Sequence, residues 1–135
     1  MTWLASTGVI RYDPPRPGLK RNKNWWAIIK IDREITRYYR WWVKKRYWID
    51  LCQPSWDAHI SIIRGEKPDA DKMHLWKKYE GKLVKFEYSP VIRQADNKPE
   101  FWFIDVRCPM LKTIRDEFGK PSNWRGHITV GRTWD

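Results

Sequence analysis

Apolar and polar residues alternate most clearly in two short stretches of the chain that resemble each other. Residues 57–63 read Asp-Ala-His-Ile-Ser-Ile-Ile, and residues 125–131 read Arg-Gly-His-Ile-Thr-Val-Gly. Successive side chains of a β-strand point to opposite faces, so in each stretch the histidine shares a face with the hydroxyl residue two positions later. Each stretch therefore predicts a strand that presents an imidazole and a hydroxyl together. The four residues are His59, Ser61, His127 and Thr129.

The same kind of pattern predicts the other elements. Apolar runs predict strands over residues 8–12, 25–31, 57–64, 83–88, 101–106 and 125–132. Apolar residues at helical spacing predict helices over residues 33–47, 71–79 and 110–118. Asp32 is expected to cap the first of these helices. Ser89-Pro90 is expected to begin a loop or an irregular strand.

These elements fall into two strand–helix–strand units, each of which ends on a histidine strand. The first unit spans about 25–64 and the second lies within about 82–135. We expect them to be two lobes of one domain over residues 25–135, preceded by a basic, proline-containing segment at 1–24. The fold class expected is α+β.

Composition adds a preference for polyanionic partners. The chain has 135 residues, a formal net charge of +11 and 16% aromatic residues, including 11 Trp. Cations neutralise phosphates and exposed rings stack on bases, so RNA or a nucleotide is the expected partner. The simpler explanation is a surface charge that only keeps the protein soluble.

No feature of the sequence predicts a membrane segment, a leader or a disulfide framework. No apolar run approaches membrane-spanning length, and the first residues lack the charged start of a secretory signal. Cys52 and Cys108 have no CxxC spacing, and both lie in or next to apolar runs. We expect them to be buried and reduced, and we expect the protein to be a cytoplasmic monomer.

Two histidines beside two hydroxyls suit acid–base chemistry at a phosphodiester. One imidazole can take a proton from the attacking oxygen while the other gives a proton to the leaving oxygen. Ser61 and Thr129 could donate hydrogen bonds to the non-bridging oxygens. Candidate substrate-binding residues lie close to the motifs: Arg64, Arg125 and Arg132 for the anion, and Trp56 and Trp124 for stacking on a base. Each of these Trp residues precedes a motif histidine by three positions and could equally be a hydrophobic plug.

Other chemistries have weaker signals. The chain has no HExxH and no paired CxxC, and His74 lies in a separate predicted helix, so no metal and no cofactor are expected. The Gly-x-Ser-x-Gly elbow of a serine hydrolase is absent. Asp57 could orient an imidazole or face the rim of the cleft.

At this point the residues resemble a known family. His59-Ile60-Ser61-Ile62 and His127-Ile128-Thr129-Val130 are similar to the paired His-x-Thr/Ser motifs of the two-histidine (2H) phosphoesterase superfamily. The resemblance implies a LigT-like bilobal fold, with two pseudo-symmetric units and antiparallel sheets around a central cleft. It also implies metal-independent hydrolysis with catalytic His59 and His127 and phosphate-binding Ser61 and Thr129.

The resemblance implies a range of substrates rather than one. It includes RNA ends with 2′,3′-cyclic phosphates, 2′,5′-linked oligonucleotides, and cyclic dinucleotide or oligonucleotide signals, in small viral or bacterial members related to RNA repair. Two alternatives stay open. One is a module that binds RNA or a nucleotide in the same basic aromatic cleft without turnover. The other is a basic RNA-binding domain whose histidines are structural, which predicts buried histidines with no common cleft.

Overall fold

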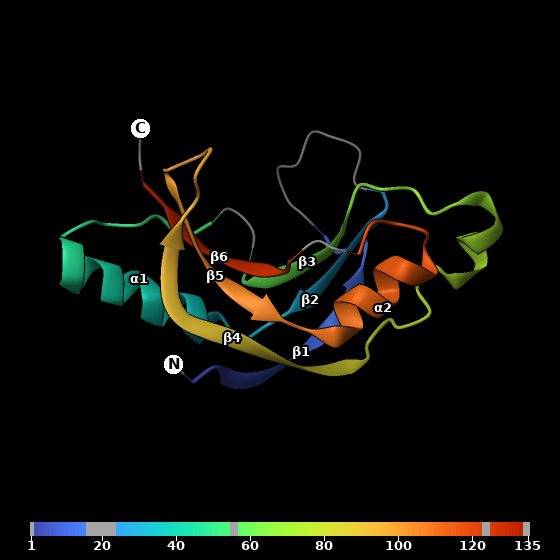
Figure 1. Ribbon diagram of the computed structural model, residues 1–135, viewed down its shortest axis with the longest axis horizontal. Coiled ribbons are helices and arrows are strands. Elements are labelled where there is room, and N and C mark those ends of the chain that lie inside the picture. Colours follow the sequence, from blue (N-terminus) through green and yellow to red (C-terminus); the bar gives the residue numbers. More distant parts are fainter. Residues whose placement is uncertain (1, 16–23, 55–56, 123–124, 134–135) are drawn as a thin grey trace.

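The structure is a computed structural model that describes residues 2–15, 24–54, 57–122 and 125–133. Within them, strands and helices follow the order β1 (Leu4–Tyr12), β2 (Trp26–Lys30), α1 (Arg33–Tyr47), β3 (His59–Arg64), the 3₁₀-helix η1 (Ala70–Leu75), β4 (Leu83–Gln94), β5 (Phe101–Arg107), α2 (Pro109–Glu117) and β6 (His127–Arg132). The two α-helices lie on opposite sides of the strands (Figure 1).

The six strands form one closed antiparallel barrel in the order β1-β2-β3-β6-β5-β4. This mixture of a sheet and flanking helices agrees with the α+β class expected from the sequence. The barrel differs from the two separate sheets that were expected, because the strands of its two halves, β1–β3 and β4–β6, are paired along two seams and form one sheet. One seam is the pairing of β1 with β4, and the other is the pairing of β3 with β6.

Strand β1 is longer than its sequence pattern indicates. It begins at Leu4 rather than at residue 8 and pairs with both β2 and β4. The boundary expected at residue 24 therefore does not separate this strand from the domain. The early part of β1, residues 4–7, is mostly exposed and has no buried apolar residue, so its pairing with β4 rather than an apolar pattern of its own makes it a strand.

Strand β4 continues through Ser89 and Pro90, as an irregular strand rather than as a loop. Its register against β5 shifts between Tyr88 and Ile92. Proline lacks an N–H for the ladder, so it is tolerated in a strand mainly at edges and at bulges. Pro90 lies within this irregular stretch.

Helix α1 begins and ends where its sequence predicts. The Asp32 side chain accepts a hydrogen bond from the Glu34 backbone N–H at 2.9 Å, which satisfies one of the unpaired donors of the first turn. Thr36, Tyr39 and Val43 form its buried face. The chain leaves the helix through Trp48, which has a left-handed backbone conformation with φ 61°.

The hydrophobic core is mostly aliphatic, and Tyr12, Tyr39, Phe86 and Phe118 add aromatic rings to it. Residues with no exposed surface are Ile10, Ala27, Ile29, Val43, Ile60, Ile62, Ile63, Ile104, Ile114, Phe118, Ile128 and Val130. Ile114 and Phe118 belong to α2 and its C-terminal end, so this helix closes the core from one side. The core includes alternate residues of β3 and β6, so the intervening residues of these strands lie on the outside of the barrel.

Two local expectations were wrong in detail. The helix expected at 71–79 is the shorter 3₁₀-helix η1, because the chain turns at Trp76 into extended backbone and Lys77 has φ 70°. Cys52 and Cys108 are half-buried free thiols rather than buried ones. Cys52 pairs with Arg132 at the end of β6, and Cys108 lies between the end of β5 and the first turn of α2. Both cysteines therefore lie next to the end of a barrel strand.

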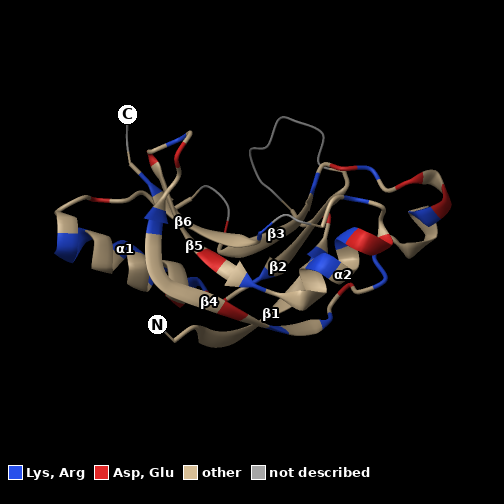
Figure 2. Ribbon diagram, in the orientation of Figure 1, with Lys and Arg blue, Asp and Glu red and all other residues tan. Residues whose placement is uncertain are grey.

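Lys and Arg occur on both helices and near several strand ends (Figure 2). In the described part of the chain, neither α-helix is long and apolar enough to cross a membrane.

Candidate phosphodiester site

The two histidine strands have the same burial pattern. His59 and Ser61 in β3, and His127 and Thr129 in β6, are half-buried on the outside of the barrel. The residues between and after them point into the core. The structural-histidine alternative predicts buried histidines, and both histidines are half-buried instead.

Strands β3 and β6 are direct neighbours, and this brings the two motifs together. Ile60 pairs with Ile128 in an antiparallel register. One residue to either side of this pair, the same register places His59 opposite Thr129 and Ser61 opposite His127. Side chains directly opposite in an antiparallel pair have Cβ atoms about 4.5–5.5 Å apart. Each imidazole thus has the hydroxyl of the other motif as its cross-strand neighbour.

Each motif is followed by a β-bulge at the same place. In β3, Ser61 pairs with Ile28 but Ile63 pairs with Ala27, so Ile62 is an extra residue. An extra residue shifts the alternation by one, and everything after it changes face. Arg64 therefore returns to the face of His59 and Ser61.

The bulge in β6 repeats that of β3. Thr129 pairs with Phe103 and Gly131 pairs with Trp102, so Val130 is the extra residue and Arg132 returns to the motif face. Both arginines lie five positions after their histidine, and both are exposed. The sequence pattern His-x-Ser/Thr-x-x-Arg occurs at both motifs and could have indicated that these two arginines belong to the site. Strand alternation alone would have placed them on the opposite face.

Gly131 is required at the β6 bulge because the loop after α1 passes very close to it. A Cβ atom at this position would lie 2.7 Å from the Cys52 carbonyl oxygen and 3.1 Å from the Leu51 Cβ. Cys52 and Arg132 exchange backbone hydrogen bonds of 2.7 and 3.2 Å across this contact. The loop after α1 is thereby fixed beside Thr129.

His59 is oriented by a backbone carbonyl. Its Nδ1 lies 2.7 Å from the Asp57 carbonyl oxygen. A carbonyl only accepts hydrogen bonds, so Nδ1 carries the proton and the second ring nitrogen, Nε2, is the one that can exchange protons. The Asp57 carboxylate does not orient the imidazole. It accepts from the Ala58 N–H at 2.9 Å and from Arg33 at 3.2 Å.

His127 has a more enclosed setting. Burial lowers its pKa below the ordinary histidine value, the positive charge of Arg64 lowers it further, and Asp105 opposes both effects. Asp105 is the cross-strand partner of His127 on β5. The Phe103 ring meets the imidazole edge to face, with centroids 5.6 Å apart. At neutral pH this setting favours the uncharged imidazole.

A hollow of about 510 Å³ opens beside His127 and Thr129. Its walls include Arg64, Lys98 and the rings of Phe101 and Phe103. Cations and aromatic rings in one hollow match the phosphate and the base of a nucleotide. Thr129 also lines two neighbouring hollows of about 300 and 390 Å³, and Arg132 lines the larger of these two.

The remaining predicted site residues have other positions. Arg125 lies with its Nη1 3.8 Å from the Asp105 carboxylate, and Arg93 donates to the same oxygen at 2.9 Å. Trp56 and Trp124 lie outside the described residues. His74 is exposed on η1. Within the described part of the chain, no three His, Cys, Asp or Glu side chains gather as metal ligands.

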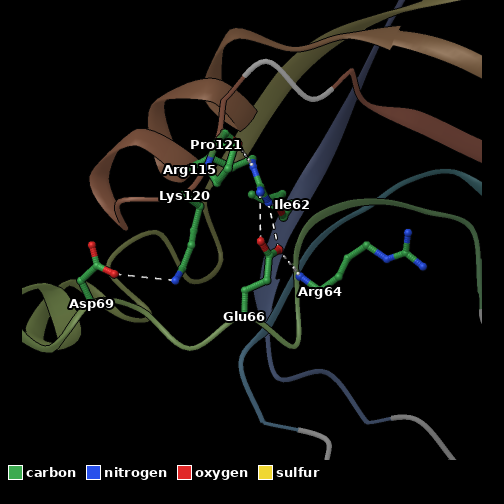
Figure 3. Close-up of polar contacts among 7 residues, drawn as sticks. All are labelled: Ile62, Arg64, Glu66, Asp69, Arg115, Lys120 and Pro121. Carbon is green, nitrogen blue, oxygen red and sulfur yellow. Dashed lines mark hydrogen bonds and ion pairs between the residues drawn. The ribbon is translucent and has the colours of Figure 1, made fainter.

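Sequence reasoning missed the two helix arginines that hold the bulges. Arg115 of α2 is 4% exposed, and its Nη1 donates to the Ile62 carbonyl at 2.7 Å (Figure 3). Arg40 of α1 donates from Nη1 to the Val130 carbonyl at 2.9 Å. Each arginine therefore binds the carbonyl of the extra residue in one bulge, across the boundary between the two strand–helix–strand units.

A carboxylate completes the Arg115 cluster. The Glu66 carboxylate accepts hydrogen bonds from Nη1 and Nη2 of Arg115 at 3.1 and 3.0 Å. It also accepts one from the Arg64 backbone N–H at 3.0 Å. Burial raises the pKa of Glu66, but the hydrogen bonds from Arg115 and Arg64 outweigh this and the net shift is downward. Figure 3 shows the Arg64 side chain pointing away from this cluster, which leaves its guanidinium available to the hollow beside His127.

Comparisons with family models, with curated proteins and with solved structures gave no match for this chain.

Proposed function

We propose that the protein is a metal-independent phosphodiesterase of the two-histidine type. Its substrate is a 2′,3′-cyclic phosphate, or another 2′-linked or cyclic phosphodiester, in an RNA end or a nucleotide signal. The observation that carries the proposal is the antiparallel pairing of Ile60 with Ile128, which makes the two histidine motifs neighbours on one face. The LigT-like arrangement of two related halves belongs to the same proposal.

The two histidines have different roles in this proposal. His127, with its lowered pKa, is the general base that removes a proton from the attacking water. The water oxygen forms the new bond to phosphorus, and the bond to the leaving sugar oxygen breaks. His59 gives its Nε2 proton to that oxygen, while its Nδ1 keeps its own proton and donates it in a hydrogen bond to the Asp57 carbonyl.

Neighbouring side chains stabilise the charge that builds on the phosphoryl oxygens. The hydroxyls of Ser61 and Thr129 are positioned by the same strands as the histidines and can donate to these oxygens. Arg64 and Arg132 return to this face after the bulges and supply positive charge. A strand positions these groups more rigidly than a loop would.

The alternative is a module that binds RNA or a nucleotide without turnover. The hollow beside His127 favours it, because Arg64, Lys98, Phe101 and Phe103 would hold a phosphate and a base whether or not a bond is broken. Two imidazoles beside two hydroxyls have no evident purpose in such a module, so we prefer the enzyme.

The test is a substrate panel with EDTA present throughout. It contains 2′,3′-cyclic mononucleotides, RNA with a cyclic-phosphate end, 2′,5′-oligoadenylate and cyclic dinucleotides, with products identified by mass spectrometry. We expect hydrolysis of at least one class, and its loss in His59→Ala and in His127→Ala. Binding without cleavage of any member would favour the alternative. Activity that requires an added metal would contradict the proposed mechanism.

A further inference from the structure

One side of α1 carries three arginines beside the site. Arg33, Arg37 and Arg40 follow one another at four- and three-residue spacing, so they share one side of the helix. All three line the hollow of about 300 Å³ that has Thr129 in its wall. This hollow therefore adjoins the proposed reaction site, because Thr129 lines it as well as the hollow beside His127.

Arg40 is the most enclosed of the three arginines, and it lacks a carboxylate partner among the described residues. Its one hydrogen bond there goes to the neutral Val130 carbonyl. Burial lowers its pKa, and the positive charge of Arg37 lowers it further. A half-buried guanidinium next to a like charge is unfavourable until an anion joins it.

The ion pairs of the other two arginines are exposed and easily replaced. Arg33 contacts Asp57 at 3.2 Å and Arg37 contacts Glu34 at 3.3 Å, and these arginine side chains are 70% and 74% exposed. Exposed pairs of this kind contribute little to stability, so both guanidiniums can turn toward a ligand at low cost.

The corresponding arginine in the other half shows what a purely structural role looks like. Arg115 also binds the carbonyl of an extra residue, but Glu66 neutralises it with two hydrogen bonds. No described carboxylate does this for Arg40. An anionic ligand would supply this negative charge to Arg40, in a hollow whose wall also contains the Glu34 and Asp57 carboxylates that pair with the other two arginines.

We propose that Arg33, Arg37 and Arg40 form a second phosphate subsite, which holds a non-reacting phosphate of a single-stranded oligonucleotide whose neighbouring phosphodiester lies at the two histidines. This inference rests on the proposed function for the identity of the neighbouring site. Its consequence is that an oligonucleotide binds more tightly than a mononucleotide with the same end, because only the longer ligand reaches α1.

The test measures binding of two probes that this chemistry does not cleave. One is a 2′-deoxymononucleotide with a 3′-phosphate, and the other is a 2′-deoxytrinucleotide with the same end. Binding is followed by calorimetry at several salt concentrations. We expect the trinucleotide to bind the wild type about fivefold more tightly or better, and its affinity to fall more steeply with salt, by a slope of about 0.7 for each additional phosphate contacted.

Two variants of α1 that lose the same charge make the test specific. Arg37→Gln should remove most of the advantage of the trinucleotide and flatten its salt dependence. Arg46→Gln is the matched control, since Arg46 is exposed in the last turn of α1 and its described contact is with the Tyr47 ring. The control should keep the advantage.

Equal affinity of the two probes for the wild type would overturn the inference, as would equal losses in both variants or no binding of either probe at millimolar concentration. Because neither probe is a substrate, these outcomes are separate from failure of the proposed hydrolysis. That failure would appear as an absence of cleavage across the substrate panel.

Discussion

Strands β3 and β6 carry the same order of side chains, but the two helix arginines that bind the carbonyls of their bulges have different surroundings. The β3 bulge is held by the buried Arg115, which Glu66 neutralises. The β6 bulge is held by the half-buried Arg40, which lines a hollow and has no carboxylate partner in the described residues. The comparison teaches that one backbone arrangement can be fixed by a closed ion pair or by a cation that stays available to a ligand.

The largest effect on the hydrolysis rate is expected from substitution of the two histidines, which occupy equivalent positions in β3 and β6. His59→Ala and His127→Ala should each lower the hydrolysis rate on the order of 10²–10⁴-fold, because each removes one of two required proton transfers. The measurement is kcat/KM on the best substrate of the panel. His74→Ala is the control, since His74 is exposed on η1, and it should keep the wild-type rate. A large loss in only one motif variant would break the equivalence of the two strands.

A large effect on stability should distinguish the two arginines. Arg115→Met leaves Glu66 without its partner, and we expect a loss of about 3 kcal/mol in the free energy of unfolding. Arg40→Met removes a hydrogen bond to a neutral carbonyl, and we expect a loss of about 1 kcal/mol. Urea denaturation followed by tryptophan fluorescence gives both values. Equal losses would mean that Glu66 adds nothing to the β3 cluster.

The Glu66 cluster should also make stability depend on pH. The pKa of Glu66 is lower in the folded protein than its ordinary value of 4.5, so the folded state favours the ionised carboxylate. Its contribution is therefore fully present above pH 4.5 and is lost as the pH falls through the lower folded pKa. Unfolding curves of the wild type and Glu66→Gln should differ at pH 7 and converge in acid. A constant difference at all pH values would contradict the assigned ion pair.

A smaller effect should separate the two arginines that follow the bulges. Arg64 lowers the pKa of His127, so Arg64→Gln should raise this pKa and move the acidic limb of the pH–rate profile to higher pH. Arg132 is not among the groups that shift His127, so Arg132→Gln should leave the midpoint of that limb in place even where it lowers the rate. Identical shifts in the two variants would show that the arginines act only through general surface charge.

Local patterns in the sequence predicted the parts of the fold that depend on neighbouring residues. The Asp32 cap and the apolar residues at helical spacing lie within one segment, and they were enough to predict the helix over 33–47, although Tyr38, one of those apolar residues, is exposed. The alternation around each histidine was likewise enough to predict which side chains share a face. In contrast, β1 depends on its pairing with β4, and nothing within residues 4–7 indicates that partner.

The site could be predicted only in part for the same reason. Pairing of β3 with β6 joins residues far apart in the chain, and the sequence predicted two facing lobes rather than adjacent strands. Arg40 and Arg115 are two basic residues among 27, and only the bulges show what distinguishes them. The five-residue spacing from histidine to arginine was present in the sequence, but its meaning depends on the extra residue in each strand.

The role of His127 as the general base is best tested by the pH dependence of kcat/KM in EDTA, measured for the wild type and for His127→Ala. The account predicts a bell-shaped profile whose acidic limb has its midpoint below the ordinary histidine value of 6.5, because the pKa of His127 is lowered. It also predicts that the residual activity of the variant lacks this limb. An acidic limb that persists unchanged in His127→Ala would contradict the assignment of His127 as the base that removes the proton from water.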